Sequence, residues 1–217
     1  MQAAIQAAMQ IKERVIVYID GFNLYFGMRE AEYHHCRWLN VKAMVKKLLK
    51  QDQELIEIQY FTSRVNNNPD KQKRQSTYIE AIESTGVKII YGNYQNGTQE
   101  CKRCGNAWAT AKEKMTDVNI ATQIIIDAFK DRYDAAMLIS GDSDLVPPIN
   151  AVHKNFKTKR VFVAFPPKRH NASMAIKAKG SFIIGRKILV DAQFEDEVIS
   201  KTGFKLKRPK TWEKLIK

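Results

Sequence analysis

The run VIVYID, at residues 15–20, decides the fold, and a glycine follows it directly. The run is short, and its residues are mostly apolar and β-branched. Such a run is typical of a strand that is buried on both faces, as strands are in a parallel sheet covered by helices. The start of the chain therefore predicts an α/β fold.

Strand and helix patterns alternate along the rest of the chain. Further strands are predicted at residues 55–62, 87–91, 135–140 and 160–165, with a weaker extended pattern at 182–190. Helices are predicted at residues 40–51, 69–85, 116–132, 145–153 and 171–178, and a loop rich in Gly, Asn and Gln at 92–111. This alternation implies right-handed crossovers and a mainly parallel sheet of about five strands, with helices on both faces.

A length of 217 residues suits one compact α/β domain with short additions at its ends. We expect a leader or short helix at residues 1–13, the main domain at 14–190 and a basic tail at 191–217. After Ser200 this tail carries seven Lys and Arg residues and one Glu. It either holds a phosphate backbone without reading sequence or is a solvated chain end.

The chain has 36 Lys and Arg residues against 23 Asp and Glu, which gives a net charge of +13. A charge of this size favours a polyanionic partner such as nucleic acid. No apolar run approaches the ~20 residues needed to cross a bilayer, and the first residues lack the features of a signal peptide. The three cysteines then indicate a reducing compartment. We expect a cytoplasmic protein without membrane association.

Acidic residues follow two of the predicted strands and begin one predicted helix. Asp20 ends the first strand, and Asp142 and Asp144 follow the strand at 135–140. In open parallel sheets the ligand crevice lies beyond the carboxyl ends of the strands, where the strand order reverses. If these two strands are neighbours, their carboxylates converge there. Asp117 begins a helix in register with its apolar face, so it is expected to point inward.

Each acid also has an ordinary structural interpretation. Asp20 suits an Asx turn, Asp142 and Asp144 suit a helix cap, and Asp117 suits the positive end of a helix dipole. Together, however, they place three or four carboxylates around one point. Such a group of like charges is tolerable when a hard divalent cation lies between them, and oxygen ligands favour Mg²⁺ or Mn²⁺ over Zn²⁺.

An acidic cluster that holds Mg²⁺ in a basic protein suits the hydrolysis of phosphodiester bonds. Asn23 would position the substrate phosphate or a metal-bound water. Arg64 and Lys114 would neutralise phosphate charge, and Ser140 is a further candidate for substrate binding.

Aromatic residues lie near the proposed site in sequence: Phe22, Tyr25, Phe26 and Trp108. Tyr25 and Trp108 are candidates to stack on unpaired bases, which would favour single-stranded RNA. Packing in the core is the alternative for all four, and it is the favoured one for Phe22 and Phe26.

Three motifs stand in order along the chain: YIDGFNLYFG at 18–27, EKMTDVNIATQII at 113–125 and LISGDSDLVPPI at 138–149. In this order they resemble the NYN domain family, the LabA-like branch of the PIN-domain nucleases. The resemblance covers roughly residues 14–165 and implies a PIN-like three-layer α/β/α sandwich with Mg²⁺- or Mn²⁺-dependent ribonuclease activity. The family's acidic site maps onto Asp20, Asp117, Asp142 and Asp144, and its characteristic asparagine onto Asn23.

Cys101 and Cys104 have the spacing of half a zinc knuckle, and a full site needs two more ligands. Cys36 with His34 or His35 would supply them from another loop, which would make a structural zinc clip over the active-site side. Free thiols in a mobile loop are the alternative. A redox pair is disfavoured, because the two cysteines do not open a helix after a strand.

The leading hypothesis is thus a metal-dependent endoribonuclease. A non-catalytic RNA-binding regulator with the same fold and a flap-type DNA nuclease stay open, as does homo-oligomerisation. A phosphatase of the haloacid-dehalogenase class is disfavoured, because Phe22 stands where that chemistry needs a second aspartate. A nucleotide-binding oxidoreductase is disfavoured because the chain lacks its glycine fingerprint.

Overall fold

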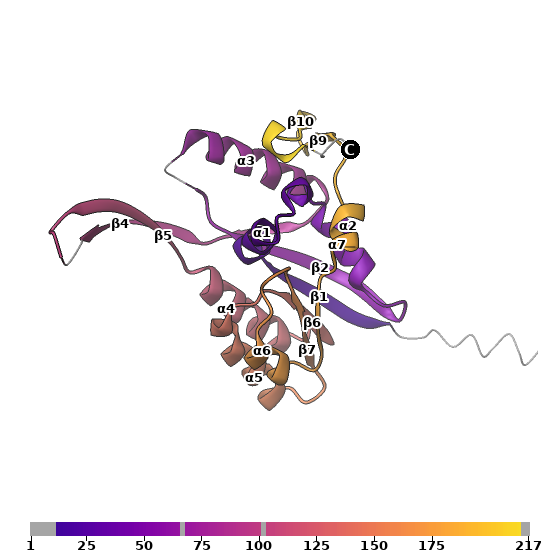
Figure 1. Ribbon diagram of the computed structural model, residues 1–217. Helices are drawn as coiled ribbons and strands as arrows, with labels where there is room; N and C mark the ends of the chain where they lie inside the picture. Colours follow the sequence, from indigo (N-terminus) through magenta and orange to yellow (C-terminus); the bar gives the residue numbers. More distant parts are fainter. Residues whose placement is uncertain (1–11, 66–67, 101–102, 214–217) are drawn as a thin grey trace, which may run out of the picture.

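The computed structural model describes residues 12–65, 68–100 and 103–213. Its central sheet has six parallel strands in the order β3-β2-β1-β6-β7-β8 (Figure 1). The strands are β1 (Glu13–Asp20), β2 (Gln53–Thr62), β3 (Lys88–Tyr91), β6 (Ala135–Ile139), β7 (Arg160–Phe165) and β8 (Ser181–Ile183). Helices cover both faces of this sheet, so the predicted α/β/α fold is confirmed.

Two apolar layers hold the helices on the sheet. On one face pack α1 (Gly21–Glu30), α2 (Val41–Leu48), α3 (Pro69–Ser84) and α7 (Arg186–Asp191). On the other pack α4 (Thr116–Phe129), α5 (Val146–Asn155) and α6 (Ala172–Lys177). In β1, Val15, Val17 and Ile19 face the first layer, and Ile16 and Tyr18 face the second. Burial of both faces explains why β1 is an unbroken apolar run.

Most predicted elements lie within a few residues of the observed ones. Asn40, Asn68 and Asn171 each cap a helix by accepting a hydrogen bond from a backbone N–H in its first turn. The sequence did not predict α1, whose two glycines interrupt its apolar pattern. The weak extended pattern at 182–190 is wrong in its second half, where α7 forms after the short strand β8.

The stretch predicted as a loop is instead an antiparallel ribbon. Its strands β4 (Asn93–Glu100) and β5 (Ala107–Lys114) pair along their whole length. The ribbon extends away from the sheet and returns directly to α4 (Figure 1). Gly, Asn and Gln are typical of loops, but two neighbouring strands can pair through their backbones without an apolar face, so composition misled the prediction.

The described part of the predicted basic tail is folded. The strands β9 (Glu197–Ile199) and β10 (Lys205–Lys207) form a hairpin, followed by a single turn, η3 (Lys210–Trp212). The Trp212 ring is 6% exposed and meets the ring of Tyr78 in α3 edge-on, with centroids 5.7 Å apart. Arg208 is buried and donates hydrogen bonds to the Asp196 carboxylate and the Phe194 carbonyl. These contacts fix the segment on α3.

The helices are short for a protein of this length. The longest described helix, α3, has 16 residues and a charged outer face. Within residues 12–65, 68–100 and 103–213, no helix has the length and apolar character that a membrane span requires.

Candidate active site

The candidate active site lies at the carboxyl edge of the sheet, between β1 and β6. These neighbouring strands run parallel and end together, with Ile19 paired to Ile139. The strand order reverses at this point, because β2 and β3 extend the sheet on one side of β1 and β7 and β8 extend it beyond β6. Asp20 and the loop after β6 therefore meet where open α/β sheets commonly bind ligands.

Asp20 is held at both of its carboxylate oxygens. Its Oδ1 accepts a hydrogen bond from the backbone N–H of Asn23 at 2.9 Å, and its Oδ2 accepts one from the hydroxyl of Ser140 at 3.0 Å. A side chain on Gly21 would lie 2.6 Å from the ring of Tyr60, so glycine is needed for α1 to begin directly after Asp20. The carboxylate is thus buried and fixed in orientation.

The loop after β6 is clamped between α1 and the start of α6. The Ser140 hydroxyl accepts a hydrogen bond from the Asp142 N–H at 3.1 Å. The Gly141 N–H donates to Asn23 Oδ1 at 3.0 Å, and its carbonyl accepts from the side-chain amide of Asn171 at 3.2 Å. A Cβ on Gly141 would come within 1.9 Å of a backbone oxygen in the segment after β7. The position of Asp142 therefore depends on this close contact.

Ser140 and Asn23, which the sequence predicted to bind substrate, have positions that suit them to orient the acidic residues. Ser140 is fully buried, and its hydroxyl joins the carboxylate of Asp20 to the backbone of Asp142. Asn23 lines the site, but its Oδ1 holds the loop after β6. Both side chains orient the acidic residues, and only the Asn23 side chain also faces the cavity.

Asp117 enters the site from the first turn of α4. Met115, directly before this helix, has a left-handed backbone with φ of 76°, which turns the chain from β5 into α4. Burial raises the pKa of Asp117, and the negative charges of Asp142 and Asp144 raise it further. A carboxylate at a helix N-terminus normally has a lowered pKa. Burial and like charge thus outweigh the backbone hydrogen bond that lowers the pKa of this carboxyl.

One cavity of about 240 Å³ joins these groups. Of the predicted residues it is lined by Asp20, Asn23, Asp117 and Asp142, and of the others by Phe22, Phe26, Thr116 and Arg169. Asp144 is exposed beside it, and its backbone N–H donates to Asp142 Oδ1 at 3.0 Å. The fold thus brings three of the four predicted acids into one cavity, with the fourth adjacent.

The donor atoms of this cavity fit a hard divalent cation. They are carboxylate and amide oxygens, and in the described residues no ion pair joins Asp117, Asp142 or Asp144 to a lysine or arginine. The same residues contain no group of three acidic, histidine or cysteine side chains that are close enough to hold one ion directly. The geometry therefore fits an ion that takes one or two carboxylates and completes its shell with water and substrate oxygens, as Mg²⁺ commonly does.

Arg169 is a site residue that the sequence analysis missed. Its guanidinium pairs with Glu30 of α1, and its Nε is buried without a hydrogen-bond partner in the described residues. The residue also lines the acidic cavity, where its guanidinium supplies a positive charge among the carboxylates. The available signal was the basic run KRH at 168–170, which follows β7 at the same edge of the sheet.

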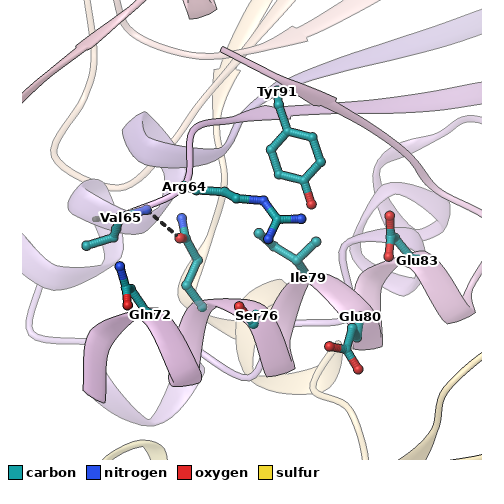
Figure 2. A pocket seen from close by; sticks show the side chains of 9 residues that line it. Arg64, Val65, Gln72, Ser76, Ile79, Glu80, Glu83 and Tyr91 are labelled. Carbon is teal, nitrogen blue, oxygen red and sulfur yellow. Dashed lines mark hydrogen bonds between the residues drawn. The ribbon is translucent and has the colours of Figure 1, made fainter. Parts of the chain in front are cut away.

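Arg64 lies in a neighbouring cavity and not among the acids. This cavity, of about 370 Å³, is formed by the loop after β2, by α3 and by the end of β3 (Figure 2). The Arg64 guanidinium lies 4.9 Å from the ring centroid of Tyr91, and Glu80 and Glu83 line the same space. Because none of the four predicted acids lines this cavity, Arg64 does not share a cavity with them, whereas Arg169 does.

Other predictions fall outside the described side chains or are not supported. Trp108 and Lys114 lie in β5 at positions whose side chains are not described, and Cys101 lies outside the described residues. Cys36 is fully buried, and burial raises the pKa of its thiol to about 11. Cys104 is exposed, and the described residues contain no group of three zinc ligands. Because Cys101 lies outside the described residues, the zinc clip stays a prediction.

The chain matches the family model of the NYN domain over residues 14–190. It is 25% identical over 198 residues to the 6-hydroxy-3-succinoylpyridine 3-monooxygenase HspA of Pseudomonas putida, a match that covers 74% of this chain and 62% of that protein. The crystal structure of a protein of unknown function from Vibrio parahaemolyticus matches with a TM-score of 0.55 and 20% identity, over 81% of this chain and 95% of that one. At this identity, the structural match shows a shared fold alone.

Proposed function

The chain belongs to the NYN domain family of the PIN-like nuclease superfamily, and from this premise we propose that it is a metal-dependent ribonuclease that hydrolyses RNA phosphodiester bonds. The observation that carries the proposal is that Asp20, Asp117 and Asp142, from three separate elements, line one cavity. The raised pKa of Asp117 supports it, because negative charge there faces negative charge. The net charge of +13 supports a polyanionic substrate.

Each side chain of the cavity has a role in this proposal. One or two of the carboxylates of Asp20, Asp117 and Asp142 would hold a divalent cation, with the others facing it from the walls of the cavity. When bound, such an ion lowers the pKa of a water and neutralises phosphate charge. Ser140 and Asn23 are positioning residues, because they fix the carboxylate of Asp20 and the loop of Asp142. Arg169 lines the same cavity, and its positive charge would neutralise a non-bridging oxygen of the scissile phosphate.

The proposal is tested with purified protein and end-labelled single-stranded RNA, duplex RNA and single-stranded DNA, each with Mn²⁺ or with EDTA. We expect RNA cleavage that requires the metal. Asp117→Asn and Asp142→Asn should each reduce the rate at least a hundredfold, as the loss of a group that acts on the reacting phosphate commonly does. Asp52→Asn is the matched control, because Asp52 is exposed at the opposite end of the sheet and the change in charge is the same.

Each other outcome points to a different protein. Metal-dependent cleavage of DNA but not RNA would make the chain a DNA nuclease. Binding of RNA without cleavage, unchanged in the aspartate variants, would make it a binding regulator. Cleavage that persists in EDTA would refute the role given to the carboxylates.

A second candidate function follows from the match to the Pseudomonas monooxygenase, although the chain spans only 62% of that protein's length. Hydroxylation of a hydroxypyridine consumes dioxygen and a reductant such as NADH. Oxygen uptake that depends on both NADH and 6-hydroxy-3-succinoylpyridine, in a preparation without nuclease activity, would favour this candidate over the ribonuclease.

A further inference from the structure

A second cavity, of about 280 Å³, lies beside the acidic one, between α1 and α3. Its walls are rich in aromatic rings: Phe22, Tyr25 and Phe26 of α1, Tyr60 of β2, Tyr78 of α3 and Trp212 of η3. The three rings of α1 are partly exposed, whereas the other three are buried behind them. The cavity therefore has partly exposed aromatic side chains on α1 and buried aromatic rings in the rest of its wall.

Among the described residues, the charged groups that line this cavity are all positive. They are Arg29, Lys71 and Arg74. The Arg29 guanidinium lies 4.7 Å from the ring centroid of Phe26, so a cation and an aromatic face act at the same place. A ligand that suits these walls is flat, aromatic and anionic, which describes a nucleotide.

The two cavities share a wall. Phe22 and Phe26 line both, and their rings lie 5.9 Å apart in a stacked arrangement. A nucleotide whose base enters the aromatic cavity therefore has its phosphate next to Asp20, Asp117 and Arg169. Because a base must leave its helical stack to enter such a cavity, unpaired strands fit it and continuous duplexes do not.

We propose that this cavity is a base-binding subsite that takes one unpaired nucleotide of the RNA beside the phosphate to be cut. The inference rests on the proposed ribonuclease function for the identity of the strand. The residues beyond 190 have a part in it, because Trp212 lines the cavity and packs edge-on against Tyr78.

The test measures binding without cleavage. Fluorescence anisotropy in EDTA gives the Kd of a short labelled RNA and of a series in which one abasic nucleotide is moved along the strand. We expect one position at which loss of the base weakens binding about tenfold, because stacking of a base on aromatic side chains is commonly of that size. At the remaining positions the effect should be small.

Variants then locate the effect. In Tyr25→Leu the penalty at that one position should largely vanish, whereas Phe129→Leu, at an exposed ring on α4, should keep it. Lys71→Ala should weaken binding and should reduce the slope of log Kd against log salt concentration by about 0.7, the value for one phosphate contact on a single strand. Lys73→Ala, which changes an exposed lysine on the same helix but outside the cavity, should have neither effect. Lys71→Ala keeps the test decisive if Tyr25→Leu does not fold.

Equal tolerance of an abasic nucleotide at every position would overturn the subsite, and so would a penalty that Tyr25→Leu leaves unchanged. The two proposals fail separately. A protein that cleaves RNA but shows no sensitive position keeps the ribonuclease and loses the subsite. A protein with a sensitive position that does not cleave in Mn²⁺ keeps the subsite and loses the ribonuclease.

Discussion

Replacing Ser140 by alanine removes a hydroxyl that connects two of the acidic residues. The hydroxyl is fully buried, donates to the Asp20 carboxylate at 3.0 Å and accepts from the Asp142 N–H at 3.1 Å. A hydrogen bond to a charged group contributes about 1.5–3 kcal/mol and a neutral one about 1 kcal/mol. Asp20 keeps its bond from Asn23, and water from the adjacent cavity can replace part of the loss. We expect a net loss of about 2 kcal/mol, or a Tm lower by about 4–8 °C.

The loss of stability is measured by urea denaturation, with Ser143→Ala as the control. Ser143 is exposed in the same loop, so the control makes the same chemical change but keeps the hydroxyl of Ser140 that joins Asp20 to Asp142. At a temperature where both variants are folded, Ser140→Ala should cleave RNA at least tenfold more slowly, because misplaced catalytic groups cost about that much or more. It should also bind Mn²⁺ more weakly in calorimetry.

If Ser140→Ala matched Ser143→Ala to within about 0.5 kcal/mol, the usual range for a surface substitution, the two buried hydrogen bonds would contribute nothing to stability. If it also cleaved RNA and bound Mn²⁺ like the control, the orientation of Asp20 would have no part in activity.

Asp117→Asn should raise the Tm of the metal-free protein at neutral pH, because the raised pKa of this carboxyl means that its ionised form opposes folding. The gain in Tm should disappear as the pH falls below the ordinary aspartate pKa of 3.8, because the carboxyl is then protonated in the folded and the unfolded protein. A gain that persists at that pH would show that the ionised carboxyl is not its cause. Asp127→Ala should lower the free energy of unfolding in urea by about 3 kcal/mol, because this fully buried carboxylate accepts hydrogen bonds from four side chains, one of them the guanidinium of Arg132. Gly141→Ala should remove most cleavage but keep the circular dichroism of the folded protein, because its Cβ would lie 1.9 Å from the Arg169 carbonyl oxygen and displace the loop; unchanged cleavage would disprove that contact.

The parallel sheet could be predicted because its strands are buried on both faces. A strand buried on both faces needs an unbroken apolar run, and β1 and β7 both have one. The predicted and observed bounds of β7 agree. The convergence of Asp20 and Asp142 was predictable for the same reason, since the carboxyl ends of neighbouring parallel strands meet at one edge.

The ribbon and the aromatic cavity could not be predicted in this way. The strands β4 and β5 pair with each other and not with the central sheet, so no buried face marks them in the sequence. Arg169 and Trp212 reach their cavities through contacts with residues more than a hundred positions away, and no local pattern records such contacts. The sequence predicted that Asp20 and Asp142 lie together, but for a positive charge it indicated Arg64 and Lys114 and not Arg169, which lines the same cavity as the acids.

The family match ends at residue 190, but the apolar layer beneath α1 and α3 continues past it. The indole N–H of Trp38 donates to the Glu195 carbonyl at 2.7 Å, and its ring packs against that of Phe194. Truncation at the family boundary would leave Trp38 and Tyr78 facing water and would remove their covering rings. The cooperative unit of unfolding therefore extends beyond residue 190, where the family match ends. The hairpin of β9 and β10 should unfold in the same transition as β1 and β2 of the central sheet.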